Sequence, residues 1–282
     1  MERFVCGGSI ESLHNAPSAE ILAELGIQTP EELHLNGKNI ERVARHLLRE
    51  DWVTLPFCNT LCSEGLGAKP NLSLDGARVK EQPYHKAEEI PEEISLDFPR
   101  MQAMLEAIAS LKQQGVNIAY EIDGPFTILS NLLPMSRMFA TLRKPSGAEL
   151  LTRIEDWIIQ YSACLVKHGV NLISFSDPVA TVDILGEKMF TETYFPYCRQ
   201  MITRLAQENP GIVIHLCGKM TQSLLDTNSC EVKRWEPEKP KETYGQTLTA
   251  FCKAFPQGGM IGHFCLNLLH AKRNWLYQIV FR

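Results

Sequence analysis

The stretch Gly211-Ile-Val-Ile-His-Leu-Cys-Gly218 decides the fold prediction, because an apolar run ends there in two side chains that commonly bind metals. In a β-strand alternate side chains share a face, so His215 and Cys217 point the same way and Leu216 points the other. An imidazole and a thiolate are two of the three protein ligands that hold a catalytic zinc ion. The rest of the chain must then supply a third ligand and a scaffold.

Strands and helices alternate on both sides of this stretch. Such alternation favours a parallel sheet joined by right-handed crossovers. With seven or eight strands, the sequence predicts one (β/α)8 TIM barrel over residues 51–282, preceded by an N-terminal helical cap over residues 1–50. Besides 211–218, the predicted strands are 52–57, 116–123, 170–176, 230–235, 260–265 and 275–281, and the predicted helices are 101–111, 147–167, 187–208, 219–226 and 242–255.

Composition and charge exclude several classes of protein. The 282 residues are 44% hydrophobic, enough for a large core, and the net charge of −5 with scattered Lys and Arg argues against a nucleic-acid partner. No apolar run approaches the length of a membrane span, and residues 1–8 lack a signal peptide, so we expect a cytoplasmic protein without membrane contact. Nine cysteines, an odd number, indicate reduced thiols instead of a disulfide framework.

A third metal ligand is available at the end of another predicted strand. Cys265 ends the run 260–265, and a closed barrel brings it beside His215 and Cys217. Two thiolates and one imidazole suit zinc and leave the fourth coordination position open for a substrate. His263, on the same predicted strand face as Cys265, is an alternative ligand, and a role as a supporting or core histidine is equally compatible with the sequence.

Carboxylates gather at the same ends of the predicted strands. Glu121 and Asp123 share a strand face just before Gly124, and Asp177 ends the next strand before Pro178. Each could lie near the metal, orient a substrate or support a ligand histidine, which makes all three candidate catalytic residues. The alternative is structural, because Asp before Gly-Pro or Pro is typical of turns and helix caps.

The remaining motifs give weaker evidence about function. Cys58 and Cys62 lie four residues apart and could bind a metal, but no second pair follows nearby, so we interpret them as structural thiols. The chain has no Gly-x-Gly-x-x-Gly between a strand and a helix, no Gly-Lys-Ser/Thr phosphate loop and no Gly-x-Ser-x-Gly. Dinucleotide enzymes, P-loop enzymes and serine hydrolases therefore have no support.

Four motifs follow one another in a distinctive order: Glu121-Ile-Asp-Gly-Pro-Phe126, Ser174-Phe-Ser-Asp-Pro-Val-Ala180, Tyr194-Phe-Pro196 and His215-Leu-Cys-Gly218. Over roughly residues 50–270 this order resembles the uroporphyrinogen decarboxylase superfamily, and more closely its methylcobamide:thiol methyltransferase branch. The resemblance implies a (β/α)8 barrel with zinc on His215, Cys217 and Cys265. It also implies transfer of a methyl group from a methylated corrinoid, carried by a partner corrinoid protein, to a small thiol.

Two alternatives belong to other functional classes. A uroporphyrinogen decarboxylase-like enzyme binds a polycarboxylate through an arginine-rich N-terminal segment, whereas here no arginine occurs between Arg3 and Arg42. Such decarboxylases also do not need the His-x-Cys pair. A non-catalytic corrinoid- or tetrapyrrole-binding accessory protein is the second alternative, because the interval from Cys217 to Cys265 is shorter than we expect for the methyltransferase branch.

Overall fold

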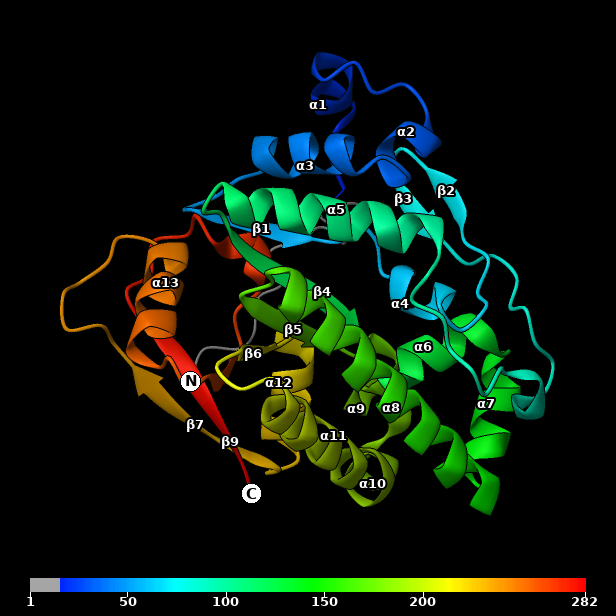
Figure 1. Cartoon of the computed structure of the whole chain (residues 1–282). Coiled ribbons are helices and arrows are strands. Elements are labelled where there is room, and N and C mark those ends of the chain that lie inside the picture. The colour runs from blue at the N-terminus through cyan, green and yellow to red at the C-terminus, as the bar shows by residue number, and fades with distance from the viewer. Residues whose placement is uncertain (1–15) are drawn as a thin grey trace.

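The computed structural model describes residues 16–282 and shows an α/β fold built on a seven-stranded sheet (Figure 1). The first five strands in the sheet order are all parallel neighbours, as predicted for a βα-type barrel. The order is β1 (Trp52–Leu55), β4 (Asn117–Asp123), β5 (Leu172–Ser176), β6 (Val213–Leu216), β8 (Gly259–Gly262), β9 (Leu276–Phe281) and β7 (Cys230–Trp235).

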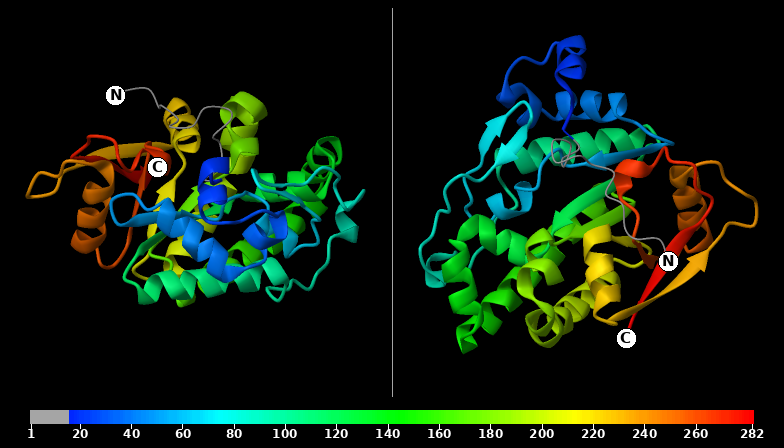
Figure 2. Two further views of the ribbon diagram at one scale, coloured as in Figure 1. Left: turned by 90° about the horizontal axis from the view of Figure 1, so that it is seen from above. Right: turned by 180° about the vertical axis from the view of Figure 1, so that it is seen from behind.

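The last two strands in this order differ from the prediction of an all-parallel sheet. β9 pairs antiparallel with β8 and with β7, so β9 runs against the other strands, and β7 lies at the edge instead of between β6 and β8. All six residues of β7 pair with β9, and this long ladder accounts for the position of β7. Among the described strands no ladder joins β7 to β1, so closure of the barrel is not seen. Figure 2 shows β9 and β7, in red and orange, at the end of the sheet that lies away from the helices following β4.

The predicted N-terminal helical segment is confirmed for the part that the structure describes, and residues 1–15 lie outside it. Ser18 accepts a hydrogen bond from the first turn of the first helix, and Thr29 with Glu32 forms a capping box at the second. The third helix packs against the helix between β1 and β4 (Figure 1). These helices are α1 (Ala19–Glu24), α2 (Pro30–His34), α3 (Gly37–His46) and α5 (Pro99–Gln113).

The remaining helices cover the sheet and bury its apolar side chains. The long ones are α8 (Pro145–His168) and α11 (Phe195–Glu208), and the others are α4 (Leu61–Glu64), α6 (Pro125–Leu132), α7 (Met135–Leu142), α9 (Val182–Leu185), α10 (Glu187–Met189), α12 (Gly218–Asp226) and α13 (Tyr244–Ala254). A π-helical turn, Phe190–Tyr194, joins α10 to α11, and a hairpin of β2 (Asn71–Ser73) and β3 (Gly76–Arg78) follows α4. Within residues 16–282, none of the helices combines the length and apolarity needed to cross a bilayer.

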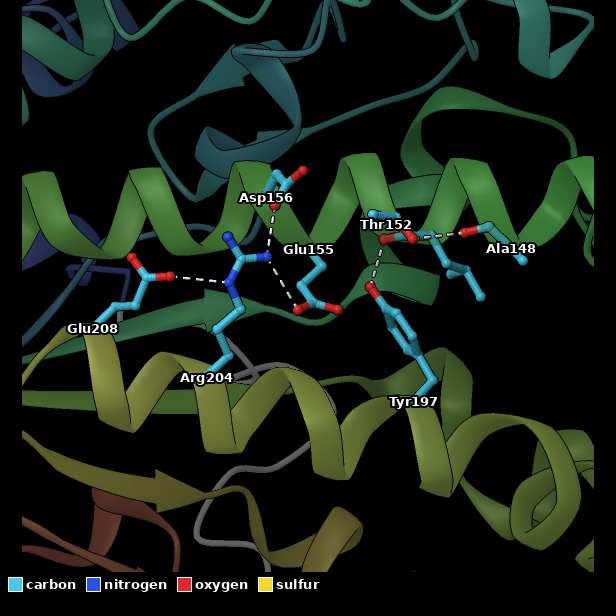
Figure 3. A network of polar contacts seen from close by, with 8 residues as sticks. Ala148, Thr152, Glu155, Asp156, Tyr197, Arg204 and Glu208 are labelled. Atoms are coloured by element: carbon cyan, nitrogen blue, oxygen red, sulfur yellow. Dashed lines mark hydrogen bonds and ion pairs between the residues drawn. The ribbon is translucent and has the colours of Figure 1, made fainter.

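A polar network joins α8 to α11 (Figure 3). Arg204 of α11 contacts Glu155 at 3.2 Å, Asp156 at 2.6 Å and Glu208 at 3.0 Å. Glu155 is almost fully buried, and the guanidinium supplies the partner that a buried carboxylate requires. Tyr197 donates a hydrogen bond to a main-chain carbonyl of α8. Every buried charge at this helix contact therefore has a partner.

Strand β8 is shorter than the predicted run 260–265. It ends at Gly262, because His263 adopts a φ of 78°, which is incompatible with an extended strand. The prediction that His263 and Cys265 share a strand face is therefore wrong. Both residues belong to the loop after β8, which leads into the single turn Leu266–Leu268.

Candidate functional site

A cavity of about 390 Å³ opens at the carboxyl ends of the parallel strands, where enzymes of the βα-barrel type place their chemistry. It collects polar residues from five strand ends that are far apart in the sequence. The wall includes three of the four predicted metal ligands and all three predicted carboxylates. Its functional side chains are Cys58, Asn59, Glu121, Asp123, Ser174, Ser176, Asp177, His215, Cys217, Lys219, Cys265 and Asn267.

The register of the sheet arranges part of this wall in two rows. Glu121 of β4 pairs with Ser174 of β5, which pairs with His215 of β6. One step further along the strands, Asp123 pairs with Ser176. Because side chains two residues apart share a face, both rows face the cavity. The first row therefore brings a carboxyl, a hydroxyl and a metal-binding imidazole to three neighbouring strands, and the second row brings a carboxyl and a hydroxyl to two of them.

His215 is held on both sides of its ring. Its Nδ1 lies 2.9 Å from Oγ of Ser174, and its Nε2 lies 2.6 Å from the carbonyl oxygen of Phe264. Burial lowers the pKa of His215 to about 4, with the Phe264 carbonyl acting in the opposite direction, so the imidazole is neutral at pH 7. A neutral imidazole is the form that binds a metal.

Cys217 follows β6 at the start of α12, and its side chain is partly exposed to the cavity. Burial and the carboxyl of Glu121 raise the pKa of the Cys217 thiol. The main-chain amides of Lys219 and Met220 and the hydroxyl of Ser176 act against this rise. Amides at a helix start favour the thiolate, which is the form that binds zinc.

The donor set of the cavity fits zinc in its chemistry. His215, Cys217 and Cys265 line one space, and one nitrogen with two sulfurs is a common catalytic zinc set. Over residues 16–282, however, no three His, Cys, Asp or Glu side chains come close enough together to hold a metal as the chain stands. Since the Nε2 of His215 donates to Phe264, next to Cys265, metal binding requires this loop or the histidine ring to shift.

Glu121 and Asp123 carry pKa values displaced by burial. Burial raises the pKa of Glu121 to about 7. Burial also raises the pKa of Asp123 well above its usual range, and the nearby charges of Glu121, Cys58 and Asp177 add to the effect. In the described part of the chain, neither carboxyl has a hydrogen-bond or ion-pair partner.

Asp177 lies in the same cavity wall but is fully engaged. It accepts hydrogen bonds from the main-chain amides of Phe126 and Thr127, from the hydroxyl of Thr127 and from that of Tyr194. Burial raises its pKa to about 6, and these bonds act in the opposite direction. The carboxyl thus caps the start of α6, a helix some 50 residues earlier in the chain, as well as facing the cavity.

Two further residues are placed by the structure in ways that decide between alternatives. His263 is buried against the rings of Phe264 and Tyr277 and is not part of the cavity wall, so Cys265 is the better candidate for the third ligand. Cys58 does line the cavity, although the sequence was interpreted as giving it a structural role. It follows the predicted strand 52–57, so the rule that chemistry gathers at strand ends would have found it.

The parallel sheet with a polar cavity at its carboxyl edge defines an α/β barrel-type protein with a thiol- and carboxyl-lined site. Comparison with known protein families identifies the chain more specifically than its fold does. The model of the uroporphyrinogen decarboxylase (URO-D) family matches residues 24–240, and the chain belongs to this family.

Similar proteins come from Methanosarcina. The methylcobamide:CoM methyltransferase MtaA of Methanosarcina barkeri is 28% identical over 225 residues, which cover 75% of this chain and 65% of the relative. The methylcobamide:CoM methyltransferase MtbA of Methanosarcina acetivorans is 25% identical over 137 residues, covering 46% and 40%. A solved methyltransferase structure from Methanosarcina mazei has a TM-score of 0.64 at 23% identity, covering 76% of this chain and 66% of that one. The alignments thus span at most about two thirds of these proteins, and the structural likeness shows the fold.

Proposed function

We propose that the protein transfers a methyl group from a methylated corrinoid to a thiol acceptor with the help of a zinc ion. The observation that carries this proposal is the convergence of His215, Cys217 and Cys265, from two separate chain segments, on one cavity. The URO-D family membership and the relatives named as methylcobamide:CoM methyltransferases support it. The corrinoid arrives on a separate corrinoid protein, and the acceptor is a small thiol.

The side chains of the cavity have distinct roles in this proposal. His215, Cys217 and Cys265 would hold the zinc ion, and a bound zinc ion would favour the thiolate form of the acceptor. The Ser174 hydroxyl contacts Nδ1 and orients the His215 ring, so Nε2 would be the nitrogen that holds zinc once its bond to the Phe264 carbonyl is released. Asp177 holds the start of α6 against the cavity wall.

The reaction balances without a further co-reactant. The thiol gives up its proton, and its sulfur forms a bond to the methyl carbon. The carbon–cobalt bond breaks, and its electron pair stays on cobalt. The products are a methyl thioether and cob(I)amide.

A uroporphyrinogen decarboxylase-like activity is less compatible with the charge of the cavity. A substrate with several carboxylates needs several basic groups, and Lys219 is the one basic side chain among the described lining residues. Lys219 itself is exposed at the first turn of α12. Within residues 16–282, the cysteines that are free thiols include Cys58, Cys62, Cys164, Cys198, Cys217, Cys230 and Cys252, which agrees with the reducing cytoplasm that we propose as the protein's location.

Metal analysis tests the zinc site directly. We expect about one zinc per chain in the purified protein and loss of most of it in a Cys217→Ser, Cys265→Ser double variant. Cys164→Ser is the matched control, because Cys164 lies on α8 outside the cavity wall and its loss leaves the metal in place. Full retention of zinc in the double variant would rule out these ligands.

Turnover is measured separately. Zinc-loaded protein is expected to remove the methyl group of methylcobalamin when a thiol is added, seen as a change in corrinoid absorbance. Tight cobalamin binding without zinc and without turnover for any thiol would instead favour the non-catalytic accessory protein.

A further inference from the structure

The carboxyls of β4 face the cavity without partners. Asp123 is only 4% exposed, and Glu121 is partly buried two residues before it. Neither has a hydrogen bond or an ion pair anywhere in residues 16–282, whereas Asp177 in the same wall receives four. Buried polar groups in proteins are nearly always satisfied. Two carboxyls that line the cavity on one strand face, without a partner among residues 16–282, therefore point to a ligand that supplies the donors.

Among residues 16–282, little compensating positive charge lies at the cavity. Arg100 lies close by and is buried, but its guanidinium is occupied by Glu64 at 2.6 Å and by the sulfur of Cys58 at 2.8 Å. It is absent from the cavity wall among the described residues, which leaves Lys219 at the exposed rim. Among the described lining residues, the carboxyls of Glu121, Asp123 and Asp177 outnumber the single lysine, and a bound cation would stabilise their ionised forms.

The two rows of the sheet fix where such a cation sits relative to the metal ligands. Glu121 and His215 are separated by one strand, which sets their backbones roughly 10 Å apart. Side chains reaching in from both sides reduce this span to the length of a small molecule. A ligand with a cationic end at β4 and a sulfur at β6 fits this arrangement.

We infer that the acceptor thiol carries a protonated amine, which Glu121 and Asp123 bind while its sulfur faces His215, Cys217 and Cys265. This inference rests on the proposed methyl transfer and adds the chemical class of the acceptor, an aminothiol. An ammonium group donates up to three hydrogen bonds, and carboxylates accept them more strongly than a neutral donor's. The amine supplies the partners that the β4 carboxyls lack.

Three thiols of equal length and different charge test the inference on the zinc-loaded full chain with methylcobalamin. They are cysteamine, which is cationic, 2-mercaptoethanol, which is neutral, and 2-mercaptoethanesulfonate, which is anionic. We expect kcat/KM for cysteamine to exceed that for the sulfonate by about 10- to 100-fold, the value of one charged hydrogen-bonded contact. An equal or reversed order overturns the inference, even when methyl transfer itself occurs.

Variants of the carboxyls locate the preference. Glu121→Gln alone, and together with Asp123→Asn, should reduce the preference for cysteamine to within about threefold of 2-mercaptoethanol, chiefly through KM. Glu192→Gln removes an exposed carboxyl outside the cavity wall and should leave the preference unchanged. If the double variant folds poorly, the single Glu121→Gln variant still decides the question. Loss of zinc in these variants overturns the inference, because the carboxyls then serve the metal.

Calorimetric binding separates this inference from the proposed function. Cysteamine and 2-mercaptoethanesulfonate are titrated into zinc-loaded protein without any corrinoid. If cysteamine binds more tightly than the sulfonate and Glu121→Gln abolishes this difference, the carboxyl–amine contact is supported. This holds even when no thiol accepts a methyl group, a result that would contradict only the proposed methyl transfer. Binding that does not depend on the charge of the thiol overturns the inference.

Discussion

Two buried carboxyls in this protein meet very different surroundings. Glu155 on α8 is 2% exposed and Asp123 on β4 is 4% exposed. Glu155 is paired with Arg204 within a network that spans two helices, while Asp123 faces the cavity without a partner among the described residues. Burying a carboxyl without a partner is costly, and proteins rarely retain such groups except where they act. The contrast distinguishes carboxyls that stabilise the fold from carboxyls that are available to bind a ligand.

Asp177 offers the sharpest test of this distinction, because it lines the cavity like Asp123 but is partnered like Glu155. Asp177→Ala leaves the amides of Phe126 and Thr127 and the hydroxyl of Tyr194 without their acceptor. We expect the free energy of unfolding to fall by about 2–4 kcal/mol, measured by urea denaturation.

The matched control for this variant is Asp183→Ala, since Asp183 is exposed on α9 and lies outside the cavity wall. Its effect should stay within about 0.5 kcal/mol. A loss of less than that for Asp177→Ala would mean that partnering does not mark a structural carboxyl, and the contrast between Glu155 and Asp123 would lose its meaning.

The α8–α11 network gives a smaller expected effect. Arg204→Ala leaves Glu155 buried without its charge partner, but the arginine side chain is 36% exposed and water can reach the gap. We therefore expect a loss of about 1–2 kcal/mol in the free energy of unfolding. Glu208→Ala, which removes an exposed partner of the same arginine, should cost only a few tenths of a kcal/mol.

A second substitution checks the cause. Adding Glu155→Gln to Arg204→Ala removes the stranded charge, so part of the lost stability should return. If the double variant is no more stable than Arg204→Ala alone, the arginine acts through packing and not as the partner of Glu155.

Much of this site was predictable from sequence because it depends on local periodicity. The alternation of side chains along a strand places Glu121 with Asp123, and His215 with Cys217, on common faces. The rule that barrel chemistry lies at strand ends then gathers them, and the observed register agrees. The same rule applied to Cys58 would have added it to the site, but Cys58 and Cys62 were interpreted as structural thiols because no second pair of metal ligands follows nearby.

The features that sequence did not predict depend on contacts between distant segments. The structural alternative for Asp177 was a turn or helix cap beside it in the sequence. It instead caps α6, which precedes it by about 50 residues and is brought to it by the pairing of β4 with β5. The place of β7 depends on its ladder with β9, 40 or more residues later. The end of β8 depends on the φ of 78° at His263, a residue type for which an extended backbone is the usual expectation.

The smallest predicted effect concerns the pH dependence contributed by Glu121. Burial raises the pKa of Glu121 from its ordinary value of 4.5 to about 7, so the folded state holds this proton more tightly than the unfolded state. The resulting stabilisation is complete below pH 4.5 and is lost as the pH rises to about 7. Glu121→Gln does not titrate, so its stability relative to the parent should rise by about 1 kcal/mol over this range, an amount reduced by the partial exposure of the side chain.

Urea denaturation of the metal-free protein at pH 4.5 and pH 7.5 measures this difference, and Glu192→Gln serves as the exposed control with no such change. The same stability difference between Glu121→Gln and the parent at both pH values would show that Glu121 already has a partner in solution. Glu121 would then resemble Glu155, and its carboxyl would not be available to a ligand. We expect the stability difference between Glu121→Gln and the parent to grow with pH in the metal-free protein. If this growth disappears when cysteamine is added to zinc-loaded protein, Glu121 is a carboxyl that binds a ligand.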